Sequence, residues 1–194
     1  MNSRMMKAIE PESVLDVFGG PKCYYREHTT VPKVVSNDYD ARFAAEHDYQ
    51  MDAFHLLTTL YAENPKVQFD LVDLDPYGSA YECFDLAVRM AKKGLVITLG
   101  ELGHRRWRRL DFVRYAYGIE SLEDFTMDRL IREIQRIGIR LDKSLVPIEA
   151  IEFNPMIGRV VFRVDPLVKT EQWTKKAEPL PTLKTGFDDW FKSD

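Results

Sequence analysis

Residues 72–80 read VDLDPYGSA, an apolar strand pattern that carries two aspartates and runs directly into a turn. Strand side chains alternate between faces, so Asp73 and Asp75 should share one face. A central parallel strand is normally apolar throughout, and an unpaired buried carboxylate costs several kcal/mol. We therefore expect at least one of these aspartates to have a chemical role. The alternative is structural: Asp75 caps the following helix and Asp73 pairs with a basic group.

Strand-like and helix-like patterns alternate around this stretch, which predicts parallel strands joined by crossover helices. The expected strands are residues 14–18, 33–37, 49–54, 69–74 and 94–100, and the expected helices are 40–48, 55–64 and 78–93, with Gly94 as a cap. A later helix should begin after an N-cap at Ser121 and stop at Gly138. Two strand-like runs, 146–153 and 158–164, are separated only by NPMI and predict a final antiparallel hairpin.

Length and composition favour one folded domain. The chain has 194 residues, of which 45% are hydrophobic and 30% are charged. We expect residues 1–166 to form that domain and residues 167–194 to form a C-terminal surface strap. The net charge of −4 gives no general attraction for nucleic acid or acidic membranes, so an anionic partner needs a local basic patch.

Cysteine usage and hydropathy exclude several classes of protein. Cys23 and Cys83 have no CxxC spacing and no matching histidine cluster, so neither a disulfide framework nor a metal site is expected. No signal-peptide core and no apolar run of about 18 residues is present. The expected location is the cytoplasm.

Three further strand ends carry residues suited to ligand binding, because open α/β sheets bind ligands beyond the carboxyl ends of their strands. Residues 16–20 (DVFGG) end in paired glycines that let a backbone approach a ligand, although a plain turn is the alternative. Asp38, after Asn37, could accept both hydroxyls of a ribose or could cap a helix. Asp52 could accept from the exocyclic amine of adenine, and Ala53 leaves room for the ring.

Together these strand ends resemble class I S-adenosylmethionine-dependent methyltransferases. VDLDPYGSA resembles the DLDP-aromatic-GS signature of the tRNA guanine-26 N2-dimethyltransferases, and VVSNDYD, MDAFHLL and KKGLVITLG follow that family's order over residues 14–100. The first motif, DVFGGPKCYYREH, and the end of the fifth strand differ from the family pattern. The resemblance implies a Rossmann-like α/β fold, mostly parallel with a final antiparallel hairpin strand, and S-adenosyl-L-methionine as cofactor. The implied cofactor-binding residues are Asp16, Phe18, Gly19, Gly20, Asn37, Asp38, Asp52, Ala53 and Asp73.

The same resemblance implies methylation of an exocyclic amino group. Such a nitrogen attacks poorly because its lone pair is delocalised into the base. The Asp75 carboxylate and the Pro76 carbonyl could accept its two hydrogens and so localise the lone pair. Tyr77 could stack on the base, a contact of roughly 1–3 kcal/mol. These three residues are the expected catalytic group.

Residues 104–109, HRRWRR, interleave basic and aromatic side chains after the fifth expected strand. That pattern suits a nucleic-acid strand, while a solvated helix face is the alternative. The expected nucleic-acid-binding residues are Arg105, Arg106, Trp107, Arg108 and Arg109.

Several functions remain open at this point. Glycine after Asp-Pro-Tyr favours the guanine-N2 type of RNA enzyme, whereas DNA adenine-N6 or cytosine-N4 methyltransferases more typically carry Asp-Pro-Pro-Tyr. A non-catalytic methyltransferase fold that binds nucleic acid or a partner is a second possibility. Methylation of a protein amide or a small-molecule amine is a third. Oligomeric state is not indicated.

Overall fold

The computed structural model describes residues 2–103, 110–154 and 156–168. The expected nucleic-acid-binding residues, and all but the first two residues of the expected strap, lie outside these ranges.

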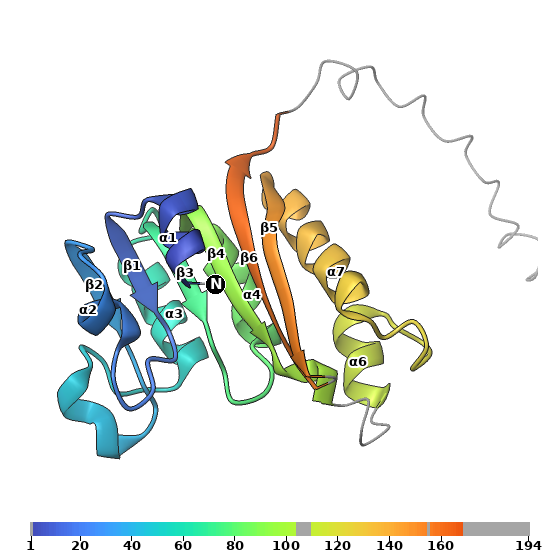
Figure 1. Cartoon of the computed structure of the whole chain (residues 1–194), viewed down its shortest axis with the longest axis horizontal. Helices are drawn as coiled ribbons and strands as arrows, with labels where there is room; N and C mark the ends of the chain where they lie inside the picture. Colours follow the sequence, from blue (N-terminus) through green and yellow to red (C-terminus); the bar gives the residue numbers. More distant parts are fainter. Residues whose placement is uncertain (1, 104–109, 155, 169–194) are drawn as a thin grey trace, which may run out of the picture.

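A six-stranded sheet forms the centre of the molecule, in the order β2-β1-β3-β4-β6-β5 (Figure 1). The strands β1 (Ser13–Asp16), β2 (Lys33–Ser36), β3 (Phe69–Leu74) and β4 (Ala91–Leu99) are parallel. β6 (Ile157–Pro166) pairs antiparallel with β4, and β5 (Lys143–Asn154) pairs antiparallel with β6. The expected mostly parallel sheet with a closing antiparallel hairpin is therefore confirmed.

Helices cover both faces of this sheet, because its central strands are apolar on both sides. Every residue of β3 is buried. One face packs against α3 (Ala53–Glu63), α4 (Phe84–Met90), α6 (Leu110–Tyr117) and α7 (Met127–Arg140). The other face carries α1 (Asn2–Ile9) and α2 (Tyr24–His28) over a smaller core. Three short 3-10 helices complete the described elements: η1 (Ala41–Glu46), η2 (Tyr81–Cys83) and η3 (Gly100–Gly103).

The helix α7 follows the predicted apolar face, but its two ends were predicted wrongly. The N-cap is Thr126, whose hydroxyl accepts from the Arg129 N–H at 3.2 Å. Ser121 instead accepts from the Asp124 N–H within the preceding turn. Gly138 lies inside the helix, where a Cβ would be 2.7 Å from Leu145, so this glycine serves the contact with β5.

Two predictions in the first half of the chain were also wrong. Residues 49–54 form no strand: Tyr49 makes an isolated bridge to Asn37, and α3 already begins at Ala53. The expected helix 78–93 is limited to η2 and α4, and Gly94 is a residue of β4 rather than a cap. A Cβ on Gly94 would lie 2.9 Å from Leu71 and 3.0 Å from Ile9, so α1 can pack closely there.

Within the described ranges, no helix is both long and apolar enough to span a membrane.

Candidate active site

A cavity of about 870 Å³ lies at the carboxyl edge of the parallel strands. Its wall combines the turn after β1, the loop after β3, the end of β4 and the tip of the β5–β6 hairpin. These parts meet at the lower edge of the sheet in Figure 1. The cavity therefore lies where open α/β sheets place their ligands.

The three expected catalytic residues all line this cavity. Pro76 is buried, the Asp75 side chain is 52% exposed, and Tyr77 is fully exposed. The loop turns at Gly78, whose φ is +132°, a conformation that favours glycine. A Cβ on Gly100 would lie 2.2 Å from the Gly78 carbonyl oxygen, so two glycines let the loop lie against η3.

The buried Glu101 fixes the end of the same loop. Its Oε1 accepts from the Ser79 hydroxyl at 2.7 Å and from the Tyr117 hydroxyl at 2.8 Å. Burial raises the pKa of Glu101, and the two hydroxyls offset part of that effect. Glu101 thus ties the loop after β3 to η3 and to α6. The sequence pattern gave no signal for this role.

A buried ionic cluster forms the floor of the cavity. Asp73 Oδ2 accepts from the Tyr25 hydroxyl at 2.5 Å and from Arg159 Nη2 at 2.6 Å. Arg159 Nη1 also donates to the Thr98 hydroxyl at 2.6 Å and lies 3.0 Å from Asp75 Oδ2. Asp73 and Asp75 therefore share one cation, as their predicted common face allows.

Burial changes the ionisation of two carboxyls in this floor. Asp16 is only 4% exposed, and burial together with the nearby Asp73 raises its pKa from 3.8 to about 7. Its Oδ2 accepts from the Cys23 thiol at 3.4 Å. Burial also raises the pKa of Asp73, although Arg159 opposes the shift. Such perturbed groups in a cavity mark a candidate functional site.

Five of the expected cofactor-binding residues line the cavity: Asp16, Phe18, Gly19, Gly20 and Asp73. The turn after β1 needs its glycines for two different reasons. A Cβ on Gly19 would lie 2.3 Å from the ring of His47, so this glycine accommodates a side chain of the protein itself. Gly20 has φ +69° and open space beside it. His47, whose Nε2 lies 2.7 Å from the Gly20 carbonyl oxygen, was not anticipated from the sequence.

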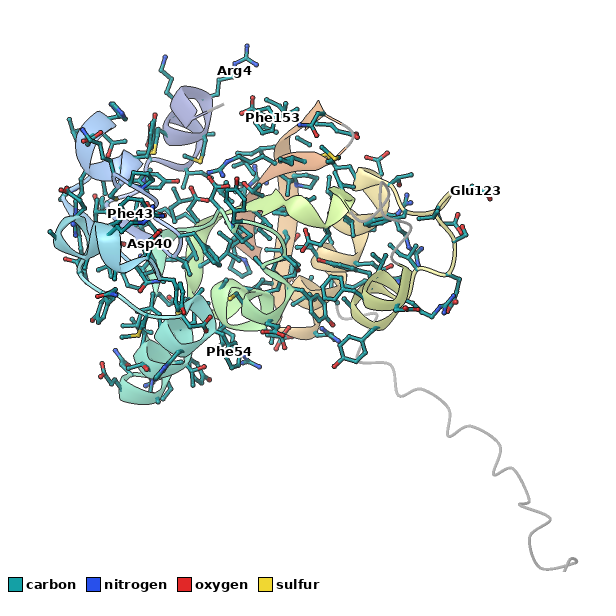
Figure 2. The ribbon with its side chains drawn as sticks, turned by 90° about the horizontal axis from the view of Figure 1, so that it is seen from below. Arg4, Asp40, Phe43, Phe54, Glu123 and Phe153 are labelled. Carbon is teal, nitrogen blue, oxygen red and sulfur yellow. The ribbon has the colours of Figure 1, made fainter. Side chains whose placement is uncertain are left out.

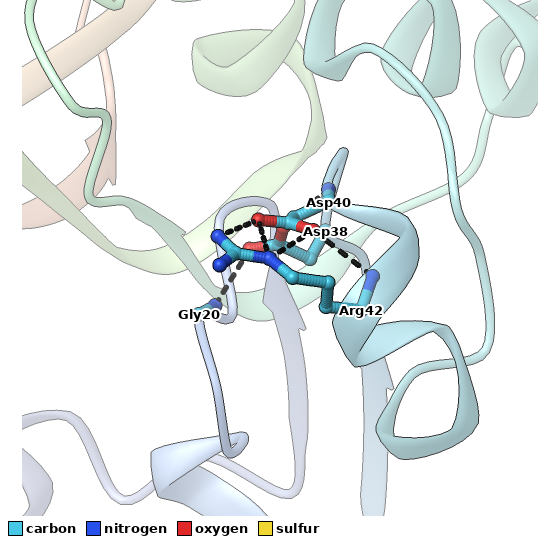
Figure 3. A network of polar contacts seen from close by, with 4 residues as sticks. All are labelled: Gly20, Asp38, Asp40 and Arg42. Atoms are coloured by element: carbon cyan, nitrogen blue, oxygen red, sulfur yellow. Dashed lines mark hydrogen bonds and ion pairs between the residues drawn. The ribbon is translucent and has the colours of Figure 1, made fainter.

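Asn37 and Asp38 do not line the cavity, and both hold loops. The buried Asn37 amide donates to the carbonyls of Val17 and Met51 at 3.0 Å each. Asp38 accepts from the Gly20 N–H at 2.8 Å (Figure 3). This bond connects the end of β2 to the glycine turn.

A second part of this polar network lies on the surface. Asp38 also accepts from the Asp40 N–H at 2.7 Å, and Asp40 forms an ion pair with Arg42 (Figure 3). The Arg42 side chain holds the pKa of Asp40 near 2. Arg42 is 79% exposed, so the pair orders η1 more than it stabilises the fold.

Asp52 and Ala53 also lie outside the cavity lining. Asp52 is the N-cap of α3 and accepts from the N–H groups of Phe54 and His55 at 3.0 and 3.1 Å. Ala53 is buried at the first turn of that helix. The local role of Asp52 is therefore helix capping.

The hairpin tip supplies cavity residues that the sequence did not single out. Phe153, Met156 and Ile157 line the cavity beside Thr98 and Arg159. Phe153 is 59% exposed and projects on the face of the sheet that carries α1, opposite Phe54 of α3 (Figure 2). A phenylalanine directly before the dipeptide Asn-Pro was the available signal in the sequence.

In the part of the chain that the structure describes, no group of three or more histidine, cysteine, aspartate or glutamate side chains could hold a metal ion.

Comparison with known proteins gives a likeness in structure. No family model matches the chain, and no curated protein matches it. Trm1 from Pyrococcus horikoshii, solved with S-adenosyl-L-methionine, is 17% identical over 84% of this chain and 52% of its own, with a TM-score of 0.67. A putative transferase from P. horikoshii is 17% identical over 84% of this chain and 62% of its own, with a TM-score of 0.50.

The N-terminal domain of EvdMO1, solved with SAH and D-fucose, is 10% identical over 84% of this chain and 80% of its own, with a TM-score of 0.50. The present chain thus spans about half the length of Trm1. The predicted resemblance is confirmed at the level of the fold: this is the Rossmann-like sheet found in Trm1.

Proposed function

We propose that the chain is an S-adenosyl-L-methionine-dependent methyltransferase that acts on an exocyclic amino group of a nucleic-acid base, with guanine N2 of RNA as the substrate. The observation that carries the proposal is the Asp75-Pro76-Tyr77 loop, which lines a cavity with a carboxylate floor and in which Asp75 and Tyr77 are exposed. The fold shared with Trm1 and the DLDP-aromatic-GS resemblance support the same reaction.

The cavity fits the cofactor in volume and in charge. About 870 Å³ lies within the usual range of small-molecule sites, roughly 300–1,000 Å³. Asp73 Oδ1 is buried without a hydrogen-bond partner among the described residues, which is unusual unless a ligand supplies the donor. With Asp16 beside it, the floor offers two carboxyls to a ligand that carries an ammonium and a sulfonium.

Outside the cavity lining, two aspartates are proposed to bind the adenosine part of the cofactor: Asp38, which follows the carboxyl end of β2, and Asp52, at the start of α3. Each oxygen of Asp38 accepts one backbone N–H and keeps a second lone pair, so it can still accept from a ribose hydroxyl. Both cap bonds of Asp52 are accepted by its Oδ1. Apart from Gly20 and its two chain neighbours, no atom of the described residues lies within 4 Å of the position that a Cβ on Gly20 would take, so a ligand has room to approach the backbone there.

The bound cofactor supplies a methyl group on a positively charged sulfur, which an amine can attack. The chain supplies the orientation of that amine. Asp75 and the Pro76 carbonyl accept its two hydrogens, which localises the lone pair and stabilises the positive charge that develops on nitrogen. Proline fixes the backbone φ angle at this position, which limits the orientations of the loop.

Two aromatic residues at the cavity are proposed to hold the base. Tyr77 comes from the loop after β3 and Phe153 from the hairpin tip, and both are exposed and line the cavity. Exposed aromatic groups beside a cavity suit a stacked base, at roughly 1–3 kcal/mol for each contact. A base in a duplex must first be flipped out of its stack.

Residues 104–109 are proposed to contact the phosphate backbone. The segment carries four arginines and directly precedes α6 in a chain whose net charge is −4. Phosphate contacts of this kind weaken as salt concentration rises.

The test is incubation with labelled cofactor and separate pools of tRNA, rRNA, single-stranded DNA and duplex DNA, followed by nucleoside mass spectrometry. We expect N2-methylguanosine from an RNA pool. Asp75→Ala should lower kcat by about 100-fold or more, with the cofactor Kd changed by less than about threefold. Asp85→Asn, at an exposed aspartate of α4, is the matched control and should be neutral.

Label found in adenine or cytosine of DNA would identify DNA, and not RNA, as the substrate. Label only in protein or in small amines, or full activity of Asp75→Ala, would contradict the proposed reaction.

A further inference from the structure

A single guanidinium lies between the carboxylates of the cavity floor. Arg159 belongs to β6, directly opposite Thr98 of β4 in the antiparallel register, and Asp73 lies one strand further away in β3. The Arg159 side chain is 11% exposed. It therefore reaches across β4 to the end of β3, beneath the proposed amine site.

The planar fork of the guanidinium allows contacts that a point charge could not make together. Nη2 donates to Asp73 Oδ2 at 2.6 Å. Nη1 donates to the Thr98 hydroxyl at 2.6 Å and forms an ion pair with Asp75 Oδ2 at 3.0 Å. Among the described residues, Asp75 Oδ1 has no hydrogen-bond donor. The pairing thus occupies one oxygen of Asp75 and leaves the other available.

The surrounding charges explain why a cation is needed there. The titratable groups that face the cluster are Asp16 from β1, Cys23 and Tyr25 from the segment of α2, Asp73 from β3, and Asp75 from the loop. Three of these are carboxyls, and Asp73 and Asp75 repel each other when both are ionised. In this group of described residues, Arg159 provides the compensating positive charge.

We propose that Arg159 is a positioning residue for methyl transfer: it bridges the Asp73 and Asp75 carboxyls and turns the free oxygen of Asp75 toward the target amine. This inference rests on the proposed function. It divides the acidic cluster into two parts, with Asp73 facing the cofactor and Asp75 facing the base. The hairpin that carries Arg159 therefore contributes to the reaction as well as to the sheet.

The first test is Arg159→Lys, which keeps the charge but cannot bridge the two carboxylates. We expect a folded protein whose kcat falls about 10- to 100-fold, while the Kd for S-adenosyl-L-methionine changes by less than about threefold. Arg163→Lys is the matched control, because Arg163 lies on the same strand, is half exposed and pairs only with Asp165 in the described structure. An unchanged kcat in folded Arg159→Lys would overturn the proposal.

The second test is the pH dependence of Arg159→Gln. Without the guanidinium, the pKa of Asp73 rises further, so the acid limb of the kcat profile should move to higher pH and activity should recover partly in alkali. A purely structural role would lower the rate at every pH and leave the limb in place. If Arg159→Gln does not fold, the Arg159→Lys result decides.

A third measurement does not depend on activity. Carbon-13 NMR of labelled aspartate carboxyls, assigned with Asp73→Asn and Asp75→Asn, follows the titration of the pair in the wild type and in Arg159→Gln. An identical titration in both proteins would overturn the inference even if the wild type methylates RNA. Absence of methylation with a shifted titration would instead reject the proposed function and retain the charge pairing.

Discussion

At the scale of single residues, the ionisation of Asp16 links the site to stability. Its pKa is about 7 in the fold against an ordinary 3.8, so the folded protein binds a proton that the unfolded chain has lost between these values. The stabilising contribution of this proton is complete below pH 4 and is lost as pH rises through about 7. An ionised Asp16 beside Asp73 is the unfavourable state.

We predict that Asp16→Asn gains stability relative to the wild type as pH rises from 5 to 8, by a few kcal/mol at most, because asparagine removes the buried charge. Urea unfolding at the two pH values measures the difference. Asp40→Asn is the control: the pKa of Asp40 is about 2, so its titration is complete below this window. An equal effect of Asp16→Asn at both pH values would show that Asp16 does not titrate there.

The carboxylates of the site could be predicted from sequence, whereas their cation could not. The alternation in VDLDP indicated that Asp73 and Asp75 share a face, and both indeed contact Arg159. Arg159 lies 86 residues beyond Asp73, and the contact depends on the register of β4 with β6. A local pattern cannot fix such a register. His47 against Gly19 escaped prediction for the same reason, because the contact joins two loops.

At the scale of elements, the loop after β3 is held from outside the cavity. Glu101 of η3 joins Ser79 of the loop to Tyr117 of α6 through one carboxylate oxygen. The helix α6 directly follows residues 104–109, which are proposed to contact phosphates. Glu101 therefore connects the loop that carries Asp75 and Pro76 to the helix next to that segment. The loop is therefore held in place by hydrogen bonds to residues outside the cavity.

We predict that Glu101→Ala destabilises the protein by about 2–4 kcal/mol, because it leaves the buried Tyr117 hydroxyl without its acceptor, removes the hydrogen bond from Ser79 and opens a cavity. The kcat should fall while the cofactor Kd is retained, since the loop loses its anchor. Thermal unfolding and single-turnover rates measure the two effects. Glu123→Ala, at the outer turn before α7 (Figure 2), should change neither. Normal kcat in folded Glu101→Ala would show that the anchor does not position the loop.

Periodicity predicted elements better than it predicted their ends. The apolar face of α7 could be predicted from the sequence, but its first residue could not. The N-cap is Thr126 and not Ser121, because the Ser121 hydroxyl accepts from the Asp124 N–H in the preceding turn. The 49–54 strand did not form because Asp52 caps α3 in the middle of that segment. The helix α6 was not predicted. It has eight residues, and few of them, including Val113 and Tyr117, face the core, so no apolar periodicity is apparent in its sequence.

At the scale of the whole molecule, the site joins parts that are distant in the chain. The cavity takes residues from the turn after β1 through to β6, and its lining includes Tyr24 and Tyr25 of α2, which belong to the side of the smaller core. A ligand that contacts all of these parts binds only the folded state. Its binding energy therefore adds to the stability of the whole fold.

We predict that S-adenosyl-L-methionine at 100 times its Kd stabilises the protein by about 2.7 kcal/mol, which corresponds to a rise in Tm of about 5–10 °C for a chain of this size. Asp38→Ala should reduce this rise at the same ligand concentration, through loss of ribose hydrogen bonds of about 1.5–3 kcal/mol each.

The comparison must use the ligand-induced shift and not the Tm itself, because Asp38 also holds the Gly20 and Asp40 N–H groups and its loss lowers stability without ligand. Methionine and adenosine, added separately, serve as controls for the two halves of the cofactor and should each give a smaller rise. No rise with millimolar cofactor would reject cofactor binding by this fold. A full rise without methylation of any nucleic-acid pool would favour the non-catalytic alternative, in which the same carboxylate floor binds the cofactor but no base reaches Asp75.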